Sequence, residues 1–294
     1  MSLKQCAMLV SINVNKPQLT KQDEKATRDA ERANNASNAG EFRKRLYPKD
    51  LIAPILQVES AARAYINSST YMWNRGEQLL PAKRFMKFAD RMAQFELEFD
   101  QAVTVFLNNF SNVLLRAEEA QGDMFDRSQY PDLSQLKAQF KLRVHYKPVT
   151  SRDDFRIQMV DDETARLLAQ VDEAALSNER SMLNDALGKL KKVVAHLNEK
   201  TGEESRMVYN KRKDCNEIKP PIFRDSIVEN IVEEIEMVRE IVDALPSGVV
   251  DIVNKVEQEL TVPATVLRDD DDKRAAVHDK SKQLLADIDN LLGD

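Results

Sequence analysis

The sequence has 294 residues, which corresponds to one large domain or to two domains of ordinary size. Hydrophobic residues make up 42% and charged residues 31% of the chain, so the composition predicts a soluble globular protein and excludes general disorder. Only 7 glycines and 10 prolines are present. This disfavours β-sandwiches, Rossmann enzymes and P-loop ATPases, because these classes need glycine at turns and phosphate loops.

The N-terminal half begins with short elements. Residues 8–15 (MLVSINVN) alternate in polarity and are β-branched, which predicts a strand that ends before Pro17. Residues 51–66 carry an amphipathic helical pattern. Residues 67–80 are interpreted as a connecting loop, after which Pro81 suits the first position of a helix.

The clearest predicted element is a long helix over residues 85–117. Its apolar residues recur at spacings of three and four, and six of the 11 phenylalanines lie on this one face. The stripe consists of Phe85, Phe88, Met92, Phe95, Phe99, Val103, Phe106, Phe110, Val113 and Ala117. We interpret it as a buried core face rather than a cofactor site, so the helix is the expected spine of the first domain.

Two further strands are predicted after this helix, at residues 140–149 (FKLRVHYKPV) and 155–160 (FRIQMV). Together with the first strand they would form a small antiparallel sheet that brings the N-terminus back to this part of the chain. Residues 1–160 are therefore predicted to form one α+β domain.

The remainder, residues 161–294, is predicted to be a helical arm. Leu183, Leu187, Leu190, Val194 and Leu197 repeat at spacings of 4, 3, 4 and 3, and a similar pattern covers residues 227–245 and 249–260. Breaks at residues 202–216, 220–221, 246–248 and 263 would fold the helices back on one another. The pattern fits an intramolecular bundle or self-association. The predicted fold class is α+β, mostly α, in which a small antiparallel sheet with long helices precedes a helical or coiled-coil arm.

Charge is unevenly distributed along the chain. Residues 1–160 hold 24 basic and 19 acidic side chains, whereas residues 161–294 hold 19 basic and 30 acidic ones. A basic first half and an acidic second half suggest that the first half contacts polyanions. The alternative interpretation is that both sets of charges are solvated helix faces.

The sequence offers little for catalysis. His145, His196 and His278 lie far apart, and no phosphate loop, nucleophile elbow or metal-binding motif occurs. We therefore expect no enzyme activity, no cofactor and no metal site. No apolar stretch approaches the roughly 18 residues of a membrane span. The first residues are too polar for a secretory signal, and Cys6 and Cys215 have no pairing pattern, so we expect a cytoplasmic protein.

Clusters of basic side chains around three aromatic residues are the candidate functional feature. Arginine and lysine can follow a phosphate backbone, and exposed rings can stack on unpaired bases, which is how proteins bind single strands with little sequence preference. The candidates are Arg43, Lys44, Arg45, Tyr47, Lys49, Trp73, Arg75, Lys83, Arg84, Lys87, Lys141, Arg143, Tyr146, Lys147 and Arg152. Because basic residues beside aromatic ones are common, half-buried rings without this role are the alternative.

The order of elements resembles a known group of phage proteins. A strand (LVSINVN) precedes a basic stretch (RKRLYPKDL) and an aromatic segment that leads into a Phe-rich helix (WNRGEQLLPAKRFMKF). This order is similar to that of a helical family of phages and mobile elements, some of whose members neighbour a MoxR-type AAA+ ATPase. It also resembles the single-stranded-DNA-binding transcription cofactor of podophages that carry a virion RNA polymerase. No functional residue is transferred by position.

Two hypotheses follow. The resemblance and the basic clusters together favour a non-enzymatic, homo-oligomeric single-stranded-DNA-binding protein. The resemblance further implies that it coats template and recruits the phage RNA polymerase in the cytoplasm of the infected host. The alternative is a helical adaptor or assembly protein that works with a AAA+ ATPase or a virion component and binds no nucleic acid.

Overall fold

A computed structural model describes residues 3–149, 162–202, 206–210, 215–219 and 223–293. Helices account for 71% of the structure, and a small four-stranded antiparallel sheet accompanies them, so the predicted α+β, mostly α class is confirmed. No helix in these described ranges combines the length and apolar composition needed to cross a membrane.

The first half of the chain contains all strands of the main sheet. Its elements are α1 (Leu3–Cys6), β1 (Ala7–Asn15), β2 (Thr20–Gln22), α2 (Glu24–Ala33), β3 (Arg43–Arg45), α3 (Lys49–Ser69), β4 (Tyr71–Met72), β5 (Gln78–Pro81), the 3₁₀ turn η1 (Ala82–Arg84), α4 (Phe85–Asn108), α5 (Phe110–Gln121), the 3₁₀ turns η2 (Gly122–Met124) and η3 (Arg127–Gln129), α6 (Leu133–Gln139) and β6 (Lys141–Pro148).

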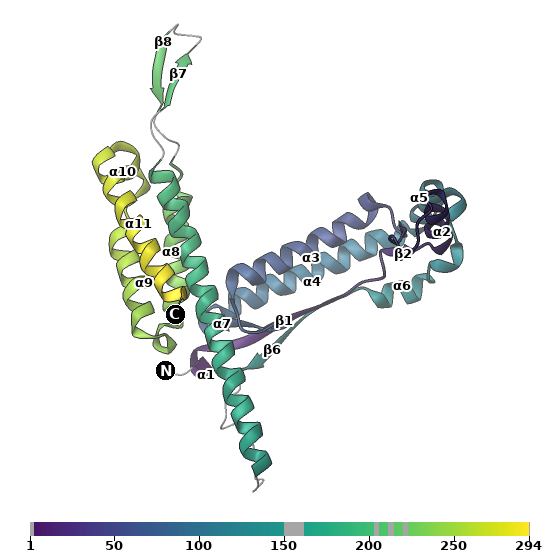
Figure 1. The fold of residues 1–294 in the computed structure, drawn as a ribbon, viewed down its shortest axis with the longest axis horizontal. Helices are drawn as coiled ribbons and strands as arrows, with labels where there is room; N and C mark the ends of the chain where they lie inside the picture. Colours follow the sequence, from purple (N-terminus) through teal and green to yellow (C-terminus); the bar gives the residue numbers. More distant parts are fainter. Residues whose placement is uncertain (1–2, 150–161, 203–205, 211–214, 220–222, 294) are drawn as a thin grey trace. The chain divides into compact units, whose positions relative to one another are not determined.

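The second half is mainly helical. Its elements are α7 (Asp162–Thr201), β7 (Arg206–Asn210), β8 (Cys215–Lys219), α8 (Ser226–Arg239), the 3₁₀ turn η5 (Val242–Ala244), α9 (Ser247–Leu260), α10 (Ala264–Asp269) and α11 (Asp271–Gly293). The predicted break at residues 202–216 includes β7 and the start of β8, which pair as an antiparallel hairpin with Arg206 opposite Lys219 (Figure 1).

The main sheet has the strand order β4-β5-β1-β6. β1 and β5 are antiparallel, with Ala7 opposite Pro81 and Val10 opposite Gln78. The strands predicted at residues 8–15 and 140–149 are thereby confirmed. The prediction of a loop at residues 67–80 was wrong. This stretch contains β4 and most of β5, and the short apolar run of β5 becomes a strand because it pairs with β1. The strand predicted at residues 155–160 lies outside the described residues.

The chain forms two compact units, and their division differs from the predicted boundary at residue 160. Unit 1 comprises residues 1–10, 69–85 and 146–294, and unit 2 comprises residues 11–68 and 86–145. The physical reason is packing: Tyr71 and Leu79, on the strands, share one buried apolar cluster with Leu187 and Leu190 of α7. The segment that carries β4, β5 and η1 therefore belongs with the helical arm.

Unit 2 is built on the Phe-rich stripe. In unit 2, α3 and α4 lie side by side (Figure 1), and the ring of Tyr65 on α3 stacks on Phe88 of α4 with ring centroids 5.6 Å apart. The stripe is buried from Phe88 to Val113, which confirms it as a core face. The single predicted helix is instead two, since a turn at Asn109 separates α4 from α5.

Unit 1 contains the helical bundle. The seam predicted at residues 183–197 packs against residues from α8, α9 and α11 in one aliphatic core, in which Leu190, Val194 and Leu197 are fully buried. The heptad-like spacing of these helices is thus used within the chain, as an intramolecular bundle.

Candidate functional site

The basic cluster around β3 is partly internal. The Lys44 side chain is buried, donates from Nζ to the Met124 carbonyl and lies 3.5 Å from the Asp23 carboxylate. Arg43 pairs with Glu41 at 3.5 Å. Arg45 and Lys49 are exposed, and neither makes an ion pair with any described residue. Two of the four cations of this cluster are therefore neutralised locally.

Two of the three predicted stacking rings are buried. Tyr47 is 4% exposed and packs edge-on against Phe106 and Tyr130, with ring centroids 5.7 and 5.8 Å away. Burial raises the pKa of Tyr47 to about 12. Trp73 is 6% exposed within the core of unit 1. Neither ring presents a face on which a base can stack, so we withdraw both from the nucleic-acid-binding set.

The cations around η1 are divided between the units. In unit 1, Arg75 and Lys83 are exposed, whereas Arg84 pairs with Glu240 at 2.9 Å. In unit 2, Lys87 is exposed. Arg75, Lys83 and Lys87 make no ion pair with the residues that the structure describes.

Strand β6 keeps the most exposed basic row. Lys141, Arg143, Tyr146 and Lys147 are exposed, while Leu142 between them is buried. Arg143 nevertheless pairs with Glu96 at 3.4 Å and Lys147 with Glu77 at 2.9 Å. The Tyr146 ring is 37% exposed and contacts Phe85 edge-on. Arg152 lies outside the described residues.

The two folded units divide the charged residues differently from the two halves of the sequence. Unit 2 holds 17 basic and 16 acidic side chains, and unit 1 holds 26 basic and 33 acidic ones. The net charge is therefore +1 for unit 2 and −7 for unit 1, so neither unit carries the +5 of residues 1–160. The separation of charge along the sequence is weaker in the folded units, which lowers the attraction of unit 2 for polyanions.

A partly buried polar cluster in unit 1 was not anticipated from the sequence. It joins the segment of β4, β5 and η1 to α7 and α8, and we call it the Glu234 cluster. Its members are Tyr71, Arg84, Asp185, Lys189, Glu234 and Glu240. Ile227, Ile231, Glu234, Val238 and Ile241 follow the spacing 4, 3, 4, 3, so a carboxylate at a heptad core position was the signal that could have revealed it.

Most of the charges in the Glu234 cluster are paired. Asp185 accepts a hydrogen bond from the backbone N–H of Met72 at 2.9 Å and pairs with Lys189 at 3.1 Å. Lys189 also donates to the Thr70 carbonyl, and its Nζ lies 5.0 Å from the centre of the Tyr71 ring. These contacts fasten β4 to α7, and the pairing offsets the cost of removing the two half-buried charges from water.

Two atoms of the Glu234 cluster are exceptions. The Tyr71 hydroxyl and Oε1 of Glu234 are buried, and neither has a hydrogen-bond partner among the described residues. Burial, the largest cause, raises the pKa of Glu234 to about 7, and nearby Asp185 adds to the shift while Lys189 and Arg84 oppose it. Burial also raises the pKa of Tyr71 well above its usual value. Glu234 can therefore gain or lose a proton near neutral pH.

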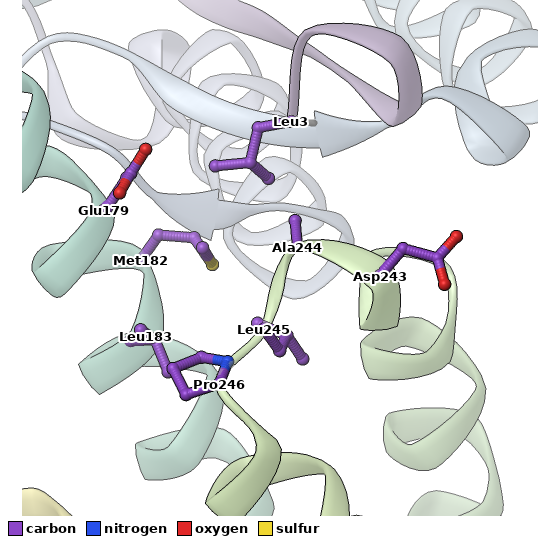
Figure 2. Close-up of a pocket in the computed structure, with 8 residues that line it drawn as sticks. All are labelled: Leu3, Glu179, Met182, Leu183, Asp243, Ala244, Leu245 and Pro246. Carbon is purple, nitrogen blue, oxygen red and sulfur yellow. The ribbon is translucent and has the colours of Figure 1, made fainter. Parts of the chain in front are cut away.

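Unit 1 also has a cavity of about 390 Å³ (Figure 2). Leu3 lies on one side, Leu245 and Pro246 lie on the other, and the Met182 side chain reaches towards the space between them. Glu179 and Asp243 also line it. Among the described residues, no group of three or more histidine, cysteine, aspartate or glutamate side chains is placed to hold a metal ion.

Comparison with known proteins does not assign the chain to a family: no family model, no curated protein and no solved structure matches it.

Proposed function

We propose that this protein is a helical adaptor or assembly protein that binds other proteins and catalyses no reaction. The main support is the state of the basic side chains. Five of the predicted DNA-contacting cations are already paired with carboxylates: Arg43, Lys44, Arg84, Arg143 and Lys147. Two of the three rings are also buried. Its partner would be a AAA+ ATPase, as the resemblance to the phage and mobile-element family suggests, or a virion component.

Exposed apolar side chains on α4 support protein binding. Met86 is 69%, Leu97 64% and Val105 69% exposed. We call Met86 and Leu97 the outer face of α4, since Val105 lies about 80° round the helix from Leu97. Met86 and Leu97 lie 11 residues apart, about three helical turns, so they share one side of the helix. Large apolar side chains on a solvent-facing helix favour association. We assign this face to contact with a second copy of the chain.

Light scattering after size-exclusion chromatography, over a range of protein concentrations, tests this assignment. The wild type should gain mass as concentration rises, and Leu97→Glu should shift the transition to at least about tenfold higher concentration, because a buried charge is costly at an apolar contact. Ser60→Glu, which adds the same charge at an exposed position of α3, is the matched control. A wild type that stays monomeric at every concentration would overturn the assignment.

Single-stranded DNA binding is the second candidate, in which the protein would coat template and serve the phage RNA polymerase. One observation favours it: on β6, Lys141, Arg143, His145 and Lys147 are all exposed and alternate with buried or half-buried Leu142 and Val144. Such a row could contact successive phosphates, with Tyr146 beside it.

Filter binding of a single-stranded oligonucleotide across salt concentrations separates the two candidates. DNA binding through β6 predicts a log–log salt slope of about −0.7 for each phosphate contact. The double variant Lys141→Ala with Lys147→Ala should make that slope shallower, while Lys282→Ala, an exposed lysine on α11, should leave it unchanged. A slope near zero for the wild type removes this candidate, and a steep slope that β6 controls would displace the adaptor proposal.

A further inference from the structure

The main sheet ends on one side at β6, which has β1 as its only strand neighbour in the described part of the chain. An edge strand presents backbone N–H and C=O groups that no further strand pairs, and such an edge can take up an added strand. β4, at the opposite edge of the sheet, has only two residues, whereas β6 has eight. β6 is therefore the edge that is long enough for an added strand, and its residues 141–145 belong to unit 2.

Two side chains already occupy this edge within unit 2. Arg143 Nη1 donates to the Leu142 carbonyl at 2.9 Å and to Glu96 Oε2 at 3.4 Å. Through its other oxygen, Glu96 on α4 accepts from the backbone N–H of Val144 at 3.2 Å. We call Arg143 and Glu96 the edge pair. It gives a donor to residue 142 and an acceptor to residue 144, which is what one residue of a parallel strand beside β6 would give.

The edge pair is accessible to solvent. The side chains of Arg143 and Glu96 are 52% and 29% exposed, and the nitrogen and oxygen of the pair are 3.4 Å apart. An ion pair that water reaches adds little to stability. An extended segment that forms several backbone hydrogen bonds with β6 can therefore replace the edge pair at small cost.

The charges on β6 determine which segment fits. Displacing Glu96 leaves Arg143 without its carboxylate, so the incoming segment has to provide one. Lys141 is also exposed and makes no ion pair with a described residue. A second copy of β6 would place like charges opposite these two cations, which is destabilising between paired strands. Nucleic acid is disfavoured because its phosphates accept hydrogen bonds and offer no donor for the Leu142 carbonyl.

We propose that residues 141–145 of β6 form a docking edge for an extended, acidic segment of a partner protein. The segment adds as a parallel strand, and one of its carboxylates takes the place of Glu96 beside Arg143. This inference rests on the proposed function, because it names the chemistry of the partner that the adaptor would hold.

Fluorescence anisotropy with a short labelled peptide of alternating glutamate and valine tests the docking edge on the full chain. The wild type should bind the peptide, and Glu96→Ala should bind it about two- to fivefold more tightly, because the edge is then open in every molecule. Lys141→Ala should weaken binding by about two- to fivefold. Asp100→Ala, which removes an exposed carboxylate from the same helix as Glu96, is the matched control and should bind like the wild type.

A second peptide separates strand addition from attraction between charges. It has the same side chains, but its backbone nitrogens are methylated, so it lacks the donors of a strand ladder and should not bind. Hydrogen exchange of the wild type needs no variant: the first peptide should increase the protection of residues 141–145. Equal binding of both peptides, no binding at about 1 mM peptide, or an unchanged affinity in Glu96→Ala would overturn the inference.

Failure of this inference can be told apart from failure of the proposed function. If the peptide does not bind while Leu97→Glu still weakens self-association, the docking edge is wrong and the adaptor proposal stands. If a single-stranded oligonucleotide binds at β6 and displaces the peptide, both proposals are wrong.

Discussion

Each unit buries a tyrosine between its strands and helices, but the two sites are built differently. In unit 2, the Tyr130 hydroxyl donates to the Leu46 carbonyl at 2.8 Å and accepts from Gln121 Nε2 at 2.6 Å. In unit 1, the Tyr71 hydroxyl has no partner among the described residues, and it interacts with Glu234, which has an unpartnered oxygen of its own. The Tyr130 hydroxyl is thus satisfied, although Oε1 of the neighbouring Gln121 is buried without a partner among the described residues, whereas the Tyr71 hydroxyl is not satisfied at all.

This difference shows why burial alone does not define a functional site. Tyr130 and Tyr71 are both at most 4% exposed. The free energy of burying a polar group is recovered only where hydrogen bonds replace those to water. Three experiments examine the contrast, beginning with the one that should give the largest effect.

Glu234→Gln should change the pH dependence of stability. The pKa of Glu234 is about 7 in the folded protein and near the ordinary glutamate value of 4.5 in the unfolded chain. Its contribution is therefore fully present below pH 4.5 and is lost as the pH rises to about 7. From the two pKa values, the variant should gain up to about 3 kcal/mol relative to the wild type between pH 4.5 and pH 8.

Urea denaturation at a series of pH values measures this change, with Glu236→Gln as the control. A difference between Glu234→Gln and the wild type that stays constant from pH 5 to pH 8 would mean that Glu234 ionises normally in the folded protein. The Glu234 cluster would then not respond to pH.

Tyr130→Phe should destabilise the protein at every pH. The substitution removes a hydroxyl that both donates and accepts, and it leaves the Leu46 carbonyl without this donor in a buried site. Loss of one partner of a buried hydrogen bond costs about 1–3 kcal/mol. The midpoint of urea unfolding should fall relative to the wild type, and this difference should be the same at every pH between 5 and 8. A neutral result would show that water replaces the hydroxyl.

Tyr71→Phe should have the smallest effect. Its hydroxyl makes no hydrogen bond with the described residues, so removing it relieves an unpaired polar atom and keeps the buried ring. We expect a change of less than about 0.5 kcal/mol at pH 5.5, in the direction of higher stability. Thermal unfolding of Tyr71→Phe beside Tyr130→Phe makes the comparison directly. A loss as large as that of Tyr130→Phe would show that Tyr71 has a partner and that the two sites are alike.

Local sequence patterns predicted the individual elements well. The alternating residues 8–15 formed β1, because a period of two has few other interpretations. The phenylalanine stripe became the core of unit 2. The loop assigned to residues 67–80 failed because β4 and β5, of two and four residues, are too short to carry a period of their own. They exist because β1 pairs with them.

The candidate site was less predictable. The basic residues were visible in the sequence, but their partners were not: Arg84 pairs with Glu240, which follows it by 156 residues. Likewise, nothing in the surroundings of Tyr47 along the chain indicates that Phe106 and Tyr130 will enclose its ring. The predicted basic surface therefore depended on contacts that are distant in sequence.

The sequence by itself determined the helical class, the aromatic spine and the heptad seams, because side-chain periodicity is a local property of the backbone. Only the tertiary structure decided which cations are paired with carboxylates, which aromatic rings are buried, and that the Tyr71 hydroxyl and one Glu234 oxygen are buried without a partner among the described residues. These outcomes depend on burial and on charge pairs between remote segments, and both arise only when the chain folds.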